Sequence, residues 1–190
     1  MEKTIMKHAK SSTEKATARK TAPPVRRTKG TVSPQRVGVF VDVQNLFYSA
    51  KYQYQSKVDF AKLLELATSA RQLIRAIAYI VQTPDIDQSS FINILTQIGF
   101  EVKSKELKVR PDGTAKGDWD MGIAIDTIAM AERLDVIVLI SGDGDFVDLI
   151  HMLKAKGVVT EVVSFPSNTA EDLKLAATAY IPLDSNILYR

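Results

Sequence analysis

Carboxylates gather at the ends of the most apolar runs of this 190-residue sequence. One aspartate interrupts the end of the run Val37–Val43, and two more follow the run Val136–Ile140. A third group follows the turn Lys116-Gly117. The acidic residues in these places are Asp42, Asp118, Asp120, Asp126, Asp143 and Asp145. Carboxylates that are crowded together repel one another, and such a cluster is usually compensated by a cation.

A hard divalent ion is the simplest compensating cation. Mg²⁺ and Mn²⁺ prefer carboxylate oxygens and water as ligands. The chain has no cysteine, so thiolate nucleophiles and Cys-based metal sites are excluded. Its two histidines, His8 and His151, are too few and too far apart in the sequence to suggest a His-rich metal site. The acidic set therefore predicts an oxygen-ligated Mg²⁺ or Mn²⁺ site, which is the minimal equipment for hydrolysis of a phosphodiester bond.

Several of these aspartates could have a structural role in place of a metal-binding one. Asp118 is suited to cap the N-terminus of a helix, where aspartate is favoured. Asp145 could cap the helix that begins near Phe146, which would leave Asp143 as the metal ligand. For Asp42, the surrounding aliphatic run offers no structural reason for a charge.

Asp120 and Asp126 can act as a pair of ligands only under one geometric condition. On a regular helix their side chains would point about 120° apart. Both can therefore reach one ion only if Asp120 lies at the unwound start of the helix.

Other phosphate chemistries lack their motifs. The sequence has neither a Gly-x-x-x-x-Gly-Lys-[Ser/Thr] loop nor a Gly-x-Gly-x-x-Gly after a strand, so the backbone cradles of P-loop NTPases and dinucleotide enzymes are missing. A haloacid-dehalogenase-like phosphatase would need a second carboxylate two residues after Asp42, where Gln44 stands.

The acidic residues must be positioned by alternating strands and helices. Strand-length runs rich in β-branched residues alternate with segments of helical apolar spacing near residues 60–67, 91–98, 123–129 and 146–153. The strand-length runs are Val37–Val43, Leu73–Val81, Val136–Ile140 and Val158–Ser164. This alternation predicts an α/β fold of three layers, with a mainly parallel sheet between two layers of helices.

Two further segments complete the expected domain. Glu101–Val109 alternates apolar and charged residues before the turn at residues 111–113, which predicts an edge strand followed by a loop. A helix near Ala170–Ala179 and a short strand Tyr180–Leu183 close the chain. Residues 37–190 are thus expected to form one domain.

Charge divides the chain at the start of this domain. Residues 1–36 hold ten Lys or Arg against two Glu, a net charge of +8, whereas residues 37–190 hold 15 against 20, a net charge of −5. With few large apolar residues, residues 1–36 are expected to form a disordered basic tail. Such a tail favours nucleic acid as a partner, although a purely solubilising extension and an organelle transit peptide remain alternatives. No apolar run is long enough to cross a membrane, so we expect no membrane partner and a cytoplasmic location.

Three motifs together resemble a known family. Val41–Leu46 resembles the Asp-x-x-Asn opening of the NYN domain, and Lys116–Asp120 with Asp126, followed by Ser141–Phe146, resembles its later motifs in the LabA-like branch. The resemblance spans residues 36–184. It implies a Rossmann-like α/β/α sandwich of the PIN-like nuclease superfamily and a metal-dependent ribonuclease site.

The resemblance also implies roles for particular residues. The predicted metal ligands are Asp42 and Asp143, completed by Asp120 or Asp126, while Asp145 helps to position water. The predicted polar neighbours that meet the substrate are Asn45, Ser141 and Lys116. The hypothesis is an Mg²⁺- or Mn²⁺-dependent endonuclease acting on single-stranded RNA. Its alternative is a non-catalytic regulator that binds RNA or protein. A homodimer is a further possibility, because PIN-like relatives often pair.

The net charge of the domain also bears on RNA binding. Because the domain is net negative, RNA must be drawn in by the tail or by a local basic patch. The candidate patch consists of Lys103, Lys105, Lys108, Arg110 and Lys116. The same lysines could equally form a solvated strand face.

Overall fold

The computed structural model describes residues 34–83, 86–109 and 115–189. The disorder predicted for the basic tail falls on residues that lie almost wholly outside this range. The loop expected at residues 111–113 and Arg110 also lie outside it.

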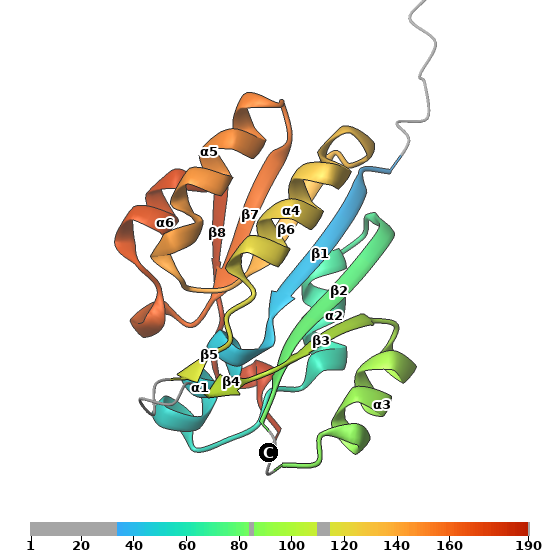
Figure 1. The fold of residues 1–190 in the computed structure, drawn as a ribbon. Helices are drawn as coiled ribbons and strands as arrows, with labels where there is room; N and C mark the ends of the chain where they lie inside the picture. Colours follow the sequence, from blue (N-terminus) through green and yellow to red (C-terminus); the bar gives the residue numbers. More distant parts are fainter. Residues whose placement is uncertain (1–33, 84–85, 110–114, 190) are drawn as a thin grey trace, which may run out of the picture. The chain divides into compact units, whose positions relative to one another are not determined.

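A sheet of six parallel strands forms the centre of the described domain, in the order β3-β2-β1-β6-β7-β8 (Figure 1). The strands are β1 (Arg36–Asp42), β2 (Gln72–Gln82), β3 (Glu101–Glu106), β6 (Val136–Ile140), β7 (Val159–Ser164) and β8 (Ala179–Pro182). The short strands β4 (Lys108–Val109) and β5 (Ala115–Lys116) pair in an antiparallel ladder of their own.

Helices cover both faces of the sheet. The layer of α1, α2 and α3 packs on one face and the layer of α4, α5 and α6 on the other (Figure 1). The helices are α1 (Val43–Tyr54), α2 (Phe60–Thr68), α3 (Ser89–Ile98), α4 (Asp120–Met130), α5 (Val147–Ala155) and α6 (Glu171–Ala176). The predicted three-layer α/β sandwich is confirmed.

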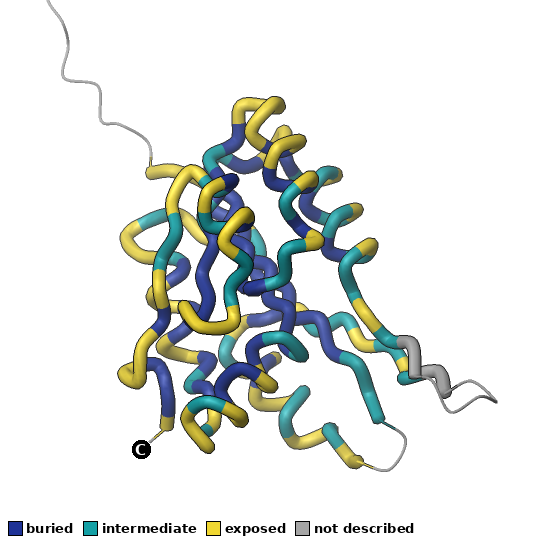
Figure 2. Tube along the Cα trace, turned by 90° about the vertical axis from the view of Figure 1, so that its left-hand side faces the viewer, coloured by how far each residue is buried: buried dark blue, intermediate teal, exposed yellow. Residues whose placement is uncertain are grey.

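Alternating side chains of the central strands supply two separate cores. In β6, Val136, Val138 and Ile140 join the core under α1, α2 and α3, whereas Ile137 and Leu139 join the core under α4, α5 and α6. All five side chains are buried, and Figure 2 shows dark blue, buried chain running through the interior of the domain. Burial on both faces explains why this strand is an unbroken aliphatic run in the sequence.

The chain reverses its direction of travel across the sheet between β1 and β6. From β1 it proceeds outward through β2 to β3, and from β6 it proceeds outward on the other side through β7 to β8. The connections that follow β1 and β6 run in opposite directions, so a crevice forms between them at the carboxyl ends of these two central strands. The carboxyl ends of β1 and β6 are therefore where a ligand site is expected.

Most predicted elements match the observed ones. β6 has the predicted bounds, and β3 is an edge strand as expected, although it ends at Glu106. Val43 starts α1 and does not end the first strand. No helical spacing was recognised over α1, because its inward side carries only Val43, Leu46, Ser49 and Ala50. Among the described residues, no helix is long and apolar enough to span a membrane.

Candidate metal centre

A polar cleft of about 510 Å³ opens at the carboxyl ends of β1 and β6. Its walls come from the start of α1, the start of α4, the loop after β6 and the loop after β7. The lining residues are Asp42, Gln44, Asn45, Tyr48, Ser49, Asp118, Trp119, Asp120, Asp143, Ser167 and Asn168. Four of the six aspartates singled out in the sequence thus line one cleft, and they come from three segments that are far apart in the sequence.

Asp42 lies at the inner end of this cleft and also has a structural role. It is the N-cap of α1, and its Oδ1 accepts a hydrogen bond from the backbone N–H of Asn45 at 3.1 Å. Its Oδ2 accepts one from the Ser141 hydroxyl at 3.4 Å. The interpretation that this charge has no structural reason was therefore wrong. Burial nevertheless raises the pKa of Asp42, and the hydrogen bonds from Asn45 and Ser141 oppose that rise.

Hydrogen bonds hold the loop after β6 against the start of α1. The Ser141 hydroxyl is buried and accepts from the backbone N–H of Asp143 at 3.2 Å, while the Asn45 Oδ1 accepts from Gly142 N–H at 3.0 Å. Ser141 and Asn45 therefore fix the spacing between Asp42 and Asp143. Their side chains were predicted to meet the substrate, and in this structure they position the carboxylates.

Asp143, and not Asp145, is the capping residue of the following helical turn. Its Oδ1 accepts from the backbone N–H of Asp145 at 3.0 Å and caps the 3₁₀ helix η2 (Gly144–Phe146). The alternative in which Asp145 was the cap is thus reversed. Asp145 is left in the first turn of η2 with an exposed side chain.

The loop after β7 packs so closely on the loop after β6 that the loop after β6 needs a glycine at position 142. A Cβ on Gly142 would lie 2.1 Å from the backbone oxygen of Asn168, and the Gly142 carbonyl accepts from Ala170 N–H at 3.0 Å. The Asn168 side chain in turn donates to the Ser49 hydroxyl at 3.1 Å. Asn168 and Ser49 are cleft residues that sequence reasoning missed, because these long-range contacts leave no local pattern.

Asp120 completes the acidic cluster from the opposite wall. It is the first residue of α4, and one carboxylate oxygen from each of Asp120, Asp143 and Asp145 lies within 4.8 Å of the other two. Burial raises the pKa of Asp120 to about 6, with further contributions from the negative charges of Asp118, Asp143, Asp42 and Asp145. Sharing one ion with Asp126 would require Asp120 to lie at an unwound helix start, whereas Asp120 is the first helical residue of α4.

Trp119, rather than Asp118, occupies the cap position of α4, and it makes no side-chain cap bond. Its indole Nε1 donates to the carbonyl of Ile80 at 2.8 Å, and its ring packs so closely on Gly122 that a Cβ there would lie 2.5 Å from it. Asp118 is exposed and lines the cleft, so the predicted cap was wrong. Trp119 thereby anchors the chain just before Asp120.

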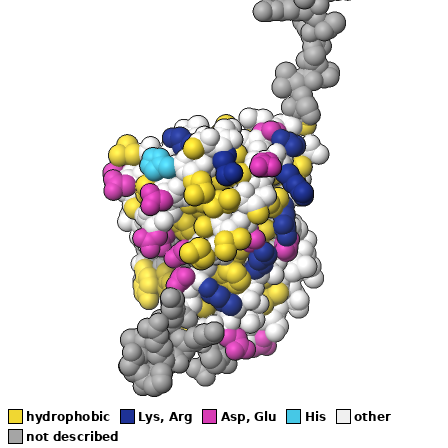
Figure 3. All heavy atoms as spheres, turned by 45° about the horizontal axis from the view of Figure 1, so that its top comes forward, with side chains coloured by type: hydrophobic (Ala, Val, Ile, Leu, Met, Phe, Trp, Pro, Cys, Tyr) yellow, Lys and Arg dark blue, Asp and Glu magenta, His cyan; other side chains and the backbone are white. Residues whose placement is uncertain are grey.

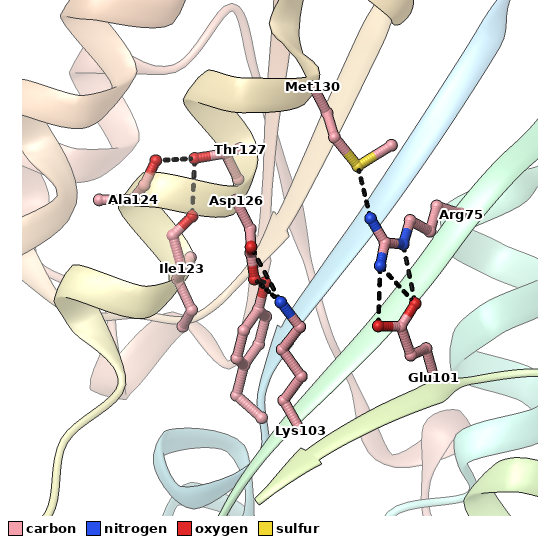
Figure 4. A network of polar contacts seen from close by, with 9 residues as sticks. Arg75, Glu101, Lys103, Ile123, Ala124, Asp126, Thr127 and Met130 are labelled. Carbon is pink, nitrogen blue, oxygen red and sulfur yellow. Dashed lines mark hydrogen bonds and ion pairs between the residues drawn. The ribbon is translucent and has the colours of Figure 1, made fainter.

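Asp126 does not lie with the other carboxylates. It accepts hydrogen bonds from the Tyr79 hydroxyl at 2.6 Å and from the Lys103 ammonium at 2.7 Å, beside the pair of Arg75 and Glu101 (Figure 4). Burial opposes ionisation of Asp126, but the bonds from Lys103 and Tyr79 prevail and lower its pKa. The prediction that Asp126 shares the metal is corrected, because its charge is already balanced by Lys103.

Two lysines of the predicted basic patch already have partners within the domain. Figure 3 shows basic side chains gathered on one side of the face it displays, with acidic ones among them. Lys103 pairs with Asp126, and the Lys105 ammonium lies 4.7 Å from the centre of the Trp119 ring. Lys116 belongs to β5, but its side chain and that of Lys108 lie outside the described part of the structure.

The donor set of the cluster fits a hard divalent ion. All of its ligand atoms are carboxylate oxygens, which suit Mg²⁺ and Mn²⁺. Within the described ranges, no ion pair involves Asp42, Asp120, Asp143 or Asp145. Burial, together with the negative charges of the neighbouring aspartates, raises the pKa of Asp120, and a bound cation would neutralise those charges.

Comparison with known proteins decides the family. The model of the NYN domain matches residues 36–184, which contain the whole sheet and every carboxylate of the cleft. The chain belongs to the NYN domain family.

Two relatives agree with this assignment. The chain is 32% identical over 159 residues to the low amplitude and bright protein LabA of Synechococcus elongatus, covering 80% of this chain and 85% of LabA. A crystal structure of a protein of unknown function from Vibrio parahaemolyticus superposes with a TM-score of 0.78 at 34% identity, covering 84% of this chain and 99% of that one. This NYN domain is thus a member of the PIN-like nuclease superfamily with an acidic cluster in its central cleft.

Proposed function

We propose that this NYN protein is a ribonuclease that hydrolyses RNA phosphodiester bonds with Mg²⁺ or Mn²⁺ held at the acidic cleft. The observation that carries the proposal is the meeting of Asp42, Asp120 and Asp143 in one cleft of a PIN-like fold. Asp145 adds a fourth carboxylate, whose oxygen lies within 4.8 Å of those of Asp120 and Asp143. A merely structural role would need one cap at each site and would not need this convergence.

The roles of the residues follow from their contacts. Asp120, Asp143 and Asp145 would hold the ion, and Asp42 would add a further oxygen from the inner end of the cleft. A divalent ion in such a site lowers the pKa of water and stabilises the negative charge that develops on the leaving oxygen. Ser141 and Asn45 keep Asp42 and Asp143 in place before the substrate arrives, which limits the reorganisation needed for reaction.

The domain's own charge shapes the expected substrate binding. Residues 37–190 carry a net charge of −5, so phosphate groups are repelled by the domain as a whole. The basic residues 1–36 would supply the general attraction, and the metal ion would supply the local one. Binding to RNA should therefore weaken steeply as the salt concentration rises.

The experiment is cleavage of end-labelled single-stranded RNA by the full-length protein with Mn²⁺, Mg²⁺ or EDTA. An Asp143→Asn variant, purified identically, serves as the contamination control. Products that require the metal and Asp143 would support the nuclease. Equal products from the variant would place the activity in a contaminant.

A non-catalytic regulator that binds RNA or protein remains the second candidate. It is favoured by the ion pair that occupies Lys103, which removes one predicted phosphate contact from the domain, and by the name of the relative LabA, which describes a phenotype and no reaction. This candidate predicts salt-sensitive binding to RNA with no product under any metal condition. The same cleavage assay, run beside a binding titration, separates the two.

A further inference from the structure

Three aromatic side chains on α1 lie exposed and close to one another. Phe47, Tyr48 and Tyr52 are 49%, 43% and 73% exposed. The centres of the Phe47 and Tyr48 rings are 5.6 Å apart in an edge arrangement, and the Tyr48 and Tyr52 rings stack with centres 5.9 Å apart. We refer to these three residues as the α1 aromatic patch.

The fold itself gives no reason for aromatic residues at these positions. The buried side of α1 consists of Val43, Leu46, Ser49 and Ala50, so the aromatic rings belong to the outward side. Grouped apolar rings on a surface cost solubility and are typical of binding sites. The patch therefore calls for a ligand with flat apolar faces.

The patch adjoins the acidic cleft. Tyr48 and Gln44 line both that cleft and a second, more apolar groove of about 790 Å³. This groove is also lined by Phe47, Lys51 and Lys57. The Lys51 ammonium lies 5.7 Å from the centre of the Phe47 ring, so positive charge accompanies the apolar surface.

We propose that the α1 aromatic patch stacks an unpaired nucleobase of the RNA strand whose phosphate lies in the acidic cleft. The inference rests on the proposed function, because it places the base beside the phosphate that is hydrolysed. A nucleotide joins an anionic group, suited to a metal held by carboxylates, to a planar ring suited to Tyr48. Lys51 and Lys57 provide the charge that a neighbouring phosphate would meet.

The substrate selected in this way is single-stranded. In a duplex the faces of each base are covered by its stacked neighbours, whereas unpaired bases are free to stack on aromatic side chains. Stacking on a ring tolerates every base, so the patch would favour unpaired strands without requiring a particular sequence.

The test measures binding and not cleavage. The full-length protein, in EDTA and in Ca²⁺ as a hard ion that carboxylates also bind, is titrated with a labelled single-stranded RNA and with the duplex of the same sequence, at several salt concentrations. The variants are Tyr48→Leu, which removes the ring, and Tyr48→Phe, which keeps it. The matched control is Tyr54→Leu, because Tyr54 lies on the same helix at 38% exposure but packs against Phe165, with ring centres 5.1 Å apart.

Tyr48→Leu is expected to weaken single-strand binding on the order of tenfold, as loss of one base–aromatic stack does. Because stacking releases no counterions, the dependence on salt should stay unchanged. Tyr48→Phe and Tyr54→Leu should bind the single strand as the wild type does. Tyr48→Leu should bind the duplex as the wild type does. Quenching of a fluorescent base analogue in the RNA by the wild-type protein, but not by Tyr48→Leu, gives a second readout.

Failure of this inference is distinguishable from failure of the proposed function. Wild-type affinity in Tyr48→Leu together with metal-dependent cleavage would overturn the stacking site and leave the nuclease standing. Ring-dependent binding without any cleavage would keep the stacking site and overturn the nuclease. A dimer that is lost in Tyr48→Leu at unchanged RNA affinity would assign the patch to a second copy of the chain and overturn the inference.

Discussion

Replacing Asp120 by asparagine should have opposite effects on stability with and without metal. Without metal, the charge of Asp120 lies close to those of Asp143 and Asp145, with carboxylate oxygens within 4.8 Å. Two unit charges at that separation repel by about 1 kcal/mol at the dielectric constant of water, which is the lower limit for groups near a protein surface, and salt screens the repulsion. Two such repulsions are relieved, so Asp120→Asn should stabilise the metal-free protein by about 1 kcal/mol.

With metal the order should reverse. A ligand present at one hundred times its dissociation constant stabilises the folded state by about 2.7 kcal/mol. For a domain of this size, each kcal/mol changes the melting temperature by about 2–4 °C. The wild-type protein should therefore melt about 5–10 °C higher in Mn²⁺ than in EDTA, whereas Asp120→Asn should gain much less.

The assay is thermal unfolding followed by circular dichroism, in EDTA and in a Mn²⁺ titration. Glu132→Gln is the control, because Glu132 is an exposed acid in η1 (Ala131–Arg133), beyond the other end of α4. It should respond to Mn²⁺ as the wild type does. An Asp120→Asn variant that is less stable than wild type in EDTA, or equally stabilised by Mn²⁺, would refute the reasoning.

The same pair of proteins predicts a dependence on pH. Burial and the neighbouring carboxylates raise the pKa of Asp120 from 3.8 to about 6 in the folded state. The folded protein then holds the proton more tightly than the unfolded chain, so stability contributed by protonated Asp120 is lost as the pH rises through 6. In EDTA the advantage of Asp120→Asn should be near zero at pH 4 and reach its full size above pH 6. An advantage that is constant over this range in denaturant titrations would contradict the assignment.

Three other perturbations test separate parts of the site. Asp126→Asn should lower the free energy of unfolding by about 1–2 kcal/mol, because Lys103 loses its partner. Cleavage of RNA by this variant should persist at reduced temperature. Loss of metal binding in this variant would return Asp126 to the metal site. Gly142→Ala should weaken Mn²⁺ binding, measured by calorimetry, because its Cβ would lie 2.1 Å from the Asn168 oxygen and the loop must move; wild-type affinity would show that loop position is unimportant. Deleting residues 1–33 should weaken RNA binding and flatten its salt dependence, whereas an unchanged salt slope would place the phosphate contacts in the domain.

The sheet was predictable because its central strands are buried on both faces. β6 is an uninterrupted run of β-branched and aliphatic residues, and the sequence bounds of Val136–Ile140 are the observed ones. By contrast, the sequence shows no clear helical spacing over α1, because its inward side carries few apolar residues and its exposed side carries Phe47, Tyr48 and Tyr52. The same aromatic residues that hid the helix are the ones that mark it as a binding surface.

The site was predictable only to the extent that it depends on strand ends. Asp42 and Asp143 follow β1 and β6, and parallel strands bring their carboxyl ends to one edge of the sheet. For Asp126 the deciding contacts come from Tyr79 on β2 and Lys103 on β3. Their pairing with α4 depends on the order of the strands, which no local spacing encodes.

The most direct test of the proposed nuclease is the chemistry of the product ends from single-stranded RNA. Hydrolysis by water should yield ends that carry phosphate and hydroxyl groups, without a 2′,3′-cyclic phosphate, because the ribose hydroxyl is not the nucleophile. These products should appear with Mn²⁺ or Mg²⁺ and should be absent in EDTA and in Asp143→Asn. Cyclic phosphate ends, or the same products from Asp143→Asn, would contradict hydrolysis at the acidic cleft.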